Sequence, residues 1–290
     1  MKKIILFIIV LVLGALLFFN FSKKGVAVKE VAATYILPTS LIHKEGRTIK
    51  TRIKVPESYV RITSLEGSFS HYIQNYKLKE ASAEVINYDG NPYIYQAGHV
   101  GVLEVPVPAN GLQQCADALI RLRSEYLWSI NRKSEIGFKF TSGHYCSWKK
   151  YADGYRPKIN GNKVTFSKTA AANNSKENFY KYLNLIYTYA GTYSLSQELK
   201  KVPQLSEVQI GDLLIYPGFP GHVMMVGDII ENDKGERRFA FFQGNTPAQS
   251  VHIIKNASDT LMSPWYDLKG KTSLNTPIYT FTSFEMVRFK

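Results

Sequence analysis

Cysteine is scarce in this sequence, which has only Cys115 and Cys146 among its 290 residues. No cysteine closely follows the N-terminal apolar run, which argues against a bacterial lipoprotein anchor. The six histidines lack metal-ligand spacing such as HExxH, so we expect no metal site and no bound cofactor. Internal repeats and low-complexity tracts are absent, and the composition, 45% hydrophobic, is that of a globular protein with a real core.

Acidic residues are also in short supply, with 23 against 36 basic ones and a net charge of +13. The lysines and arginines are scattered, without a long basic block or a nucleic-acid-binding fingerprint, so nucleic acid is a poor candidate partner. A positive surface of this kind favours anionic partners such as cell-wall polymers or phospholipid head groups.

One apolar run, Ile4–Phe19, stands apart from the rest of the chain and continues through Phe21, with lysine pairs at positions 2–3 and 23–24 on its flanks. Residues 1–21 are therefore predicted to be a signal anchor or a signal peptide. The nearest small-x-small pattern, Gly25-Val26-Ala27, lies beyond the second lysine pair, which favours an uncleaved anchor in the membrane. Residues 22–34 then form a tether, and the remainder is expected outside the cytoplasm, in the cell envelope or periplasm.

Residues 35–290 are predicted to form one α+β domain. Helices are expected in two places, one after an N-cap at Asn110 and one from Asn174 to Gly191, with a shorter helix at Ser194–Val202. Residues 131–172, rich in Gly, Lys and Asn, are predicted to be an irregular insertion. On the first helix, Asp117, Arg121 and Glu125 have i,i+4 spacing and are expected to pair on the solvent side.

Strands are expected before the first helix and after the last one. The early candidates are Tyr59–Thr63, Ala83–Tyr88 and Val100–Val107, and the late ones are Asp212–Tyr216, His222–Ile230, Arg238–Gln243, Val251–Ile254 and Phe284–Phe289. Because the helices precede the late strands instead of alternating with them, we expect an antiparallel sheet, with the helix that carries Cys115 packed on the strand that carries His222.

Cys115 has three open interpretations. It can pair with Cys146 in a disulfide that closes a loop of about 30 residues and contributes roughly 3 kcal/mol. It can also be a small buried hydrophobic residue. Third, it can be a nucleophile whose pKa is depressed by the helix N-terminus and by the imidazole of His222. His222 has a plain alternative as a hydrogen-bonded histidine at a strand start.

A set of motifs occurs in an order that resembles the CHAP amidases and the related NlpC-type cell-wall peptidases. The motifs are Gly111-Leu112-Gln113-Gln114-Cys115, Gly211-Asp212-Leu213-Leu214-Ile215-Tyr216, Gly221-His222-Val223-Met224-Met225-Val226 and Phe241-Phe242-Gln243-Gly244-Asn245. The resemblance implies a papain-like fold with Cys115 as nucleophile and His222 as base. The chain departs from these families in spacing, since roughly 95 residues separate Cys115 from Asp212.

The same resemblance implies that a polar residue on the strand after His222 orients the imidazole. Asn245 and Gln243 are both candidates, and the CHAP pattern favours Asn245. Backbone N–H groups near Cys115, with Gln113 or Gln114, are candidates for an oxyanion hole. Asp212 is better explained as a carboxylate that caps a turn.

A second resemblance covers nearly the whole exported part of the chain. It rests on Gln114-Cys115-Ala116-Asp117-Ala118, Phe140-Thr141-Ser142-Gly143, Pro220-Gly221-His222 and Pro247-Ala248-Gln249, and it is to the exported bacterial family called domain of unknown function 4846. Two functions follow as expectations. One is an extracytoplasmic cysteine amidase or peptidase that acts on a cell-wall-type amide, and the other is a non-catalytic envelope module for binding or structure.

Overall fold

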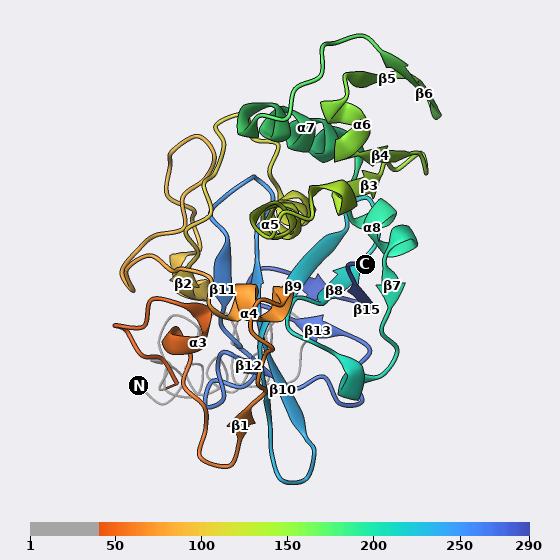
Figure 1. Ribbon diagram of the computed structural model, residues 1–290. Coiled ribbons are helices and arrows are strands. Elements are labelled where there is room, and N and C mark those ends of the chain that lie inside the picture. Colours follow the sequence, from red (N-terminus) through yellow and green to blue (C-terminus); the bar gives the residue numbers. More distant parts are fainter. Residues whose placement is uncertain (1–40) are drawn as a thin grey trace, which may run out of the picture.

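The structure, a computed structural model, describes residues 41–290 (Figure 1). The predicted anchor at residues 1–21 and the tether at 22–34 lie outside the described residues. Within residues 41–290, every helix is too short or too polar to traverse a bilayer.

An antiparallel sheet of nine strands forms the centre of the molecule. Seven strands follow the order β2, β11, β10, β9, β8, β15, β7, while β1 pairs with β9 and β12 pairs with β10. The strands are β1 (Val60–Arg61), β2 (His99–Val102), β7 (Lys200–Lys201), β8 (Leu213–Tyr216), β9 (His222–Glu231), β10 (Arg237–Gln243), β11 (His252–Ile254), β12 (Trp265–Tyr266) and β15 (Glu285–Arg288). The α+β class and the antiparallel sheet that carries His222 are confirmed.

Strand β9 lies at the centre of this sheet and is covered on both faces. Every residue from His222 to Ile230 is buried, which explains why the segment is a nearly continuous apolar run without strand alternation. Helix α5 (Cys115–Ser129) packs against β9, and α7 (Lys176–Tyr189) covers α5 from the other side (Figure 1).

Helix α5 begins at Cys115, later than the sequence predicted. Gln114 is the N-cap residue, and its backbone N–H donates to the carboxylate of Asp117 over 3.0 Å. Asn110 is not the cap; its side-chain oxygen accepts the N–H of Leu112 in a turn before the helix. The helix ends before Asn131, whose φ of 60° is the left-handed conformation common after a helix C-terminus.

The predicted charge pairs on α5 are only partly present. Arg121 pairs with Glu125 over 2.9 Å. Asp117 and Arg121 are both buried instead of facing solvent, and Asp117 caps the helix start and makes no pair with Arg121. The expectation failed because α7 and the segment before α5 cover this side of the helix.

The later helices are close to their predicted positions. Helix α7 begins after Ser175, whose hydroxyl accepts the N–H of Asn178 over 3.1 Å, so Asn174 is not the cap. Helix α8 spans Thr192–Glu198 and stops before β7, shorter than the predicted 194–202.

Residues 131–172 are ordered, contrary to the predicted irregular insertion. They form a 3-10 turn and two hairpins around a short helix, namely η2 (Lys133–Glu135), β3 (Gly137–Lys139), β4 (Tyr145–Ser147), α6 (Trp148–Ala152), β5 (Tyr155–Asn160) and β6 (Lys163–Lys168). The indole of Trp148 lies 5.7 Å from that of Trp128 on α5 and 5.6 Å from the ring of Phe179 on α7. These aromatic contacts join the segment to the main core, and local composition carries no sign of them.

The region before α5 contains less strand than predicted. Tyr59–Thr63 and Val100–Val107 shorten to β1 and β2, and Ala83–Tyr88 is not a strand, since Ile86 and Asn87 make only single bridges to Pro92 and Gln249. Short helical elements fill the remainder: α3 (Ile49–Arg52), α4 (Phe69–Gln74) and η1 (Gln96–Gly98). The turn η3 (Leu205–Glu207) precedes β8, and a separate hairpin of β13 (Leu274–Asn275) and β14 (Thr280–Phe281) precedes β15.

Candidate functional site

His222 is placed by a tight turn between β8 and β9. A Cβ atom on Gly221 would overlap the Thr192 hydroxyl and lie 2.7 Å from the Tyr216 carbonyl oxygen, so only glycine fits there. The next residue, His222, opens β9 opposite Tyr216. Its side chain is 3% exposed.

The imidazole of His222 is held by Gln243, the last residue of β10. The Nε2 atom of His222 lies 2.7 Å from Oε1 of Gln243, which is a carbonyl oxygen and can only accept. His222 therefore carries its proton on Nε2, and Nδ1 is left as the acceptor. Asn245 does not take this position, since it is half-buried with its amide 3.5 Å from the hydroxyl of Tyr93. The geometry thus favours Gln243 over Asn245 as the orienting residue.

Cys115 lies at the first position of α5, against the start of β9. The backbone N–H groups of Ala116 and of Val223, the residue after His222, are close enough to its sulfur to lower the pKa of the thiol. A Cβ on Gly244 would lie 3.1 Å from the Gln114 carbonyl oxygen, so the end of β10 passes directly beside the first turn of α5. These contacts bring Cys115, His222 and Gln243 to the same end of the sheet.

The electrostatics of this group are those of a closed site. Burial, with a smaller contribution from nearby Asp117, raises the pKa of the Cys115 thiol to about 12, and the N–H groups of Ala116, Val223 and Cys115 offset only part of the increase. Burial also lowers the pKa of His222 to about 4, partly opposed by the hydrogen bond to Gln243. Both groups are therefore neutral at pH 7. The expected depression of the thiol pKa is wrong for this conformation, in which Cys115 is 7% exposed.

The two glutamines before Cys115 have different environments. Gln113 is fully buried: its amide donates to the Pro106 carbonyl, and its Oε1 accepts from Arg121. Both polar ends of the Gln113 side chain are thus used in hydrogen bonds within the protein, which is a structural role. The side chain of Gln114 is partly exposed, and its Oε1 accepts from the hydroxyl of Thr246 over 2.9 Å. Its amide N–H groups remain oriented by that bond and are the better candidate for an oxyanion hole.

Other residues singled out in the sequence have structural roles. Asp212 accepts the backbone N–H of Gln209 and binds Arg288 over 2.6 Å, as a turn-capping carboxylate would. Cys115 and Cys146 are both free, so the disulfide interpretation is wrong for this structure. Cys146 is buried on β4, where the hydroxyl of Tyr182 donates to its carbonyl oxygen.

Two features near His222 were missed in the sequence. His252 on β11 pairs in register with Gln243, and its ring lies 6.1 Å from that of His99 on β2. The ring of Tyr279, from the β13–β14 turn, lies 4.6 Å from the imidazole of His222. No local pattern indicated either contact, because both join segments far apart in the chain. Within residues 41–290, no group of three or more His, Cys, Asp or Glu side chains has the geometry to hold a metal ion.

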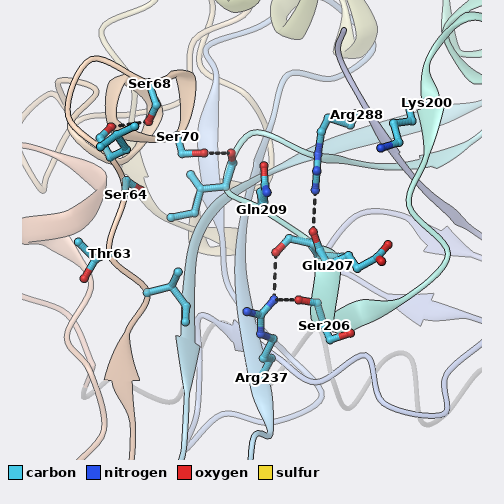
Figure 2. A pocket seen from close by; sticks show the side chains of 14 residues that line it. Thr63, Ser64, Ser68, Ser70, Lys200, Ser206, Glu207, Gln209, Arg237 and Arg288 are labelled. Atoms are coloured by element: carbon cyan, nitrogen blue, oxygen red, sulfur yellow. Dashed lines mark hydrogen bonds between the residues drawn. The ribbon is translucent and has the colours of Figure 1, made fainter.

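A polar pocket of about 620 Å³ lies elsewhere, between the 62–70 loop and the 206–210 turn. Figure 2 shows Ser64, Ser68 and Ser70 on one side and Arg237 and Arg288 on the other. The arginines are already engaged, since Arg237 donates to the carbonyls of Ser206 and Val208, and Arg288 binds the carbonyl of Glu207. None of the predicted site residues lines this pocket.

Together, the sheet and its helices define an α+β protein with a buried thiol at the start of α5 and an imidazole, at the start of β9, that Gln243 holds. Residues 49–288 match the family described as Domain of unknown function (4846), and the chain belongs to this family. No curated protein and no solved structure matches the chain.

Proposed function

We propose that the protein is an extracytoplasmic cysteine amidase or peptidase that cleaves a cell-wall-type amide. The observation that carries the proposal is the 2.7 Å hydrogen bond between His222 and Gln243, which leaves imidazole Nδ1 as an acceptor at the end of the sheet where Cys115 begins α5. A nucleophile, a base and a group that orients the base are the parts that covalent amide hydrolysis needs. The arrangement supports a papain-like organisation of the site.

In the proposed reaction, the thiol of Cys115 transfers its proton to Nδ1 of His222 as the sulfur attacks the carbonyl carbon. The position of the sulfur at a helix N-terminus stabilises the developing thiolate. The tetrahedral oxyanion is held by the backbone N–H of Cys115 and the side-chain amide of Gln114. His222 then donates the proton to the amine as the C–N bond breaks. Water, deprotonated by His222, hydrolyses the thioester and releases the carboxylate and the thiol.

The proposed substrate and location follow from the charge and the N-terminus. A net charge of +13 suits an anionic cell-wall polymer, and the predicted anchor at residues 1–21 supports a location of the remaining chain outside the cytoplasm. We expect the purified envelope protein to retain Ile4–Phe21. Intact-mass measurement checks this, and a mature N-terminus between Gly14 and Glu30 contradicts it.

The test of the proposed function is hydrolysis of peptidoglycan fragments by the full chain, followed as new amino groups. Cys115→Ser is expected to lose at least 100-fold in rate, because a serine hydroxyl is a far poorer nucleophile in a site built for sulfur. Cys146→Ser is the matched control and is expected to keep its rate. The enzyme proposal is wrong if the wild-type protein releases no amine from any peptidoglycan fragment, whichever amide linkage the fragment contains.

A second function is favoured by one observation, the 7% exposure of Cys115. A thiol sealed in this way suits a non-catalytic envelope module that retained the scaffold for binding or structural work. In that case, a broad alkylating reagent labels neither cysteine of the folded protein, and ligand binding is unaffected by Cys115→Ser.

A further inference from the structure

The imidazole of His222 lies under a short turn of the chain. The β13–β14 hairpin places Thr276–Tyr279 at its tip, and the ring of Tyr279 lies 4.6 Å from that of His222. Beyond it, Phe281 lies 5.5 Å from His222 and 4.8 Å from Tyr279. Cys115 and His222 are only 7% and 3% exposed, so a substrate carbonyl reaches the sulfur only after some part of the surrounding structure moves.

The turn is held less firmly than its base. Leu274 and Phe281, in the two hairpin strands, and Thr276, at the start of the turn, are buried, whereas Pro277 and Tyr279 are partly exposed. The hairpin is a separate two-stranded sheet, and in the described part of the chain no backbone hydrogen bond joins Thr276–Tyr279 to the nine-stranded sheet.

Within the turn, Thr276 and Tyr279 bond one another. The Thr276 hydroxyl donates to the Tyr279 carbonyl over 2.7 Å and accepts the Tyr279 N–H over 3.1 Å. The hydrogen bonds of the turn are therefore internal, and the turn contacts His222 through the side chain of Tyr279. Pro277 provides a second side-chain contact, with Gly98, since a Cβ on Gly98 would lie 3.1 Å from its Cβ.

We propose that the Thr276–Tyr279 turn is a lid over the Cys115–His222 pair, and that substrate reaches the thiol only when Tyr279 leaves the imidazole. The inference rests on the proposed amidase function, for which it supplies the opening step. Burial raises the pKa of Tyr279, and the neighbouring Tyr216 and Cys115 raise it further, which agrees with a phenol close to the sulfur. A lid that removes water and then completes the site is a common device in enzymes that form reactive intermediates.

The first test is the rate at which iodoacetamide labels Cys115 in the full chain at pH 8, with mass spectrometry to resolve the two cysteines. Tyr279→Ala is expected to raise the Cys115 rate at least tenfold and leave buried Cys146 unchanged. Phe219→Ala is the matched control, because Phe219 is an aromatic residue 80% exposed on the turn before His222 and stacks with Tyr193 at 6.0 Å. We expect that control to label like wild type.

The second test fixes the turn in its closed position with a disulfide. In the double variant Gly98→Cys/Pro277→Cys, the two Cβ positions are close enough for a disulfide after a small movement, since disulfides have Cβ atoms about 3.8 Å apart. After oxidation by diamide, confirmed by peptide mapping, Cys115 is expected to label at least fivefold more slowly than in wild type, and a reductant is expected to restore the rate.

The outcomes separate the lid from the amidase. An unchanged Cys115 rate in Tyr279→Ala, equal acceleration at both cysteines, or wild-type labelling in the cross-linked protein overturns the lid. Faster labelling without hydrolysis of any peptidoglycan fragment supports the lid and overturns the enzyme. Hydrolysis by wild type with no effect of either variant on labelling leaves the enzyme standing and removes the lid.

Discussion

At the scale of single residues, the contact between His222 and Gln243 is the most informative about function. Both side chains are buried, and the amide nitrogen of Gln243 has no hydrogen-bond partner in the described structure. A half-satisfied glutamine in a core is costly, so its retention beside an imidazole is better explained by a role in orienting that ring than by stability.

Gln243→Leu is the sharpest test of that role. It leaves the Nε2–H of His222 buried and unpaired, which is expected to lower the free energy of unfolding by about 1–3 kcal/mol and to reduce amide hydrolysis. Asn245→Ala is the matched control and is expected to change neither. Urea unfolding and the hydrolysis rate measure the two effects. If Asn245→Ala loses hydrolysis activity while Gln243→Leu hydrolyses at the wild-type rate, Asn245 and not Gln243 orients the imidazole.

The buried histidines predict that the folded protein loses stability at acidic pH. His252 allows this loss to be tested at a residue outside the proposed catalytic group. Burial lowers the pKa of His252 to about 4, and its Nδ1 donates to the Ser250 carbonyl. Between pH 6.5 and 4, the unfolded chain binds a proton that the folded chain does not, so stability falls as the pH falls.

From pH 7 to pH 5, this single group is expected to remove about 2 kcal/mol from the free energy of unfolding. His252→Gln, which keeps a donor for Ser250, should lose correspondingly less stability over the same interval. Urea unfolding at the two pH values provides the comparison. Parallel losses in variant and wild type would mean that His252 does not contribute to acid sensitivity.

At the scale of elements, the β8–β9 turn decides where the histidine lies. Gly221 is enclosed by the Thr192 hydroxyl of α8 and by backbone atoms of its own turn, whereas a Cβ on Gly218 would come no closer than 3.3 Å to any atom. The turn therefore depends on one of its two glycines much more than on the other.

Gly221→Ala is expected to destabilise the protein by about 1–3 kcal/mol, because backbone at 2.7 Å cannot yield as a flexible side chain would. Displacement of His222 should also reduce amide hydrolysis. Gly218→Ala serves as the matched control and should stay within about 0.5 kcal/mol of wild type. Thermal unfolding measures both variants, and equal behaviour of the two would refute the packing argument.

At the scale of the whole molecule, residues 131–172 belong to the main core. Trp148 packs between α5 and α7, against the rings of Trp128, Phe179 and Tyr182. A segment attached in this way should unfold with the sheet and not before it.

Trp148→Ala is therefore expected to lower the free energy of unfolding of the whole molecule by about 3–5 kcal/mol, in one cooperative transition. Tyr155→Ala, at a half-exposed tyrosine on the outer hairpin, is the control and should have a small effect. Calorimetry distinguishes the cases. Two separate transitions in Trp148→Ala would indicate that the segment folds as an independent unit.

The sequence by itself determined those features that short-range pattern controls. The apolar run from His222 to Ile230 gave β9, the periodicity around Leu119 and Leu122 gave α5, and the order of helices before strands gave the antiparallel sheet. The sequence also predicted that Cys115 lies at the front of a helix and that His222 opens a strand, since both positions follow from local pattern.

Only the tertiary structure decided the rest. Gln243 instead of Asn245 meets His222 because β10 ends beside the first turn of α5, which depends on strand register and on the close approach at Gly244. The burial of Cys115, the position of Tyr279 over the imidazole and the ordering of residues 131–172 arise from contacts between segments distant in the chain. Burial and the pKa shifts that follow from it are properties of packing, and the identity of a residue and its sequence neighbours does not fix them.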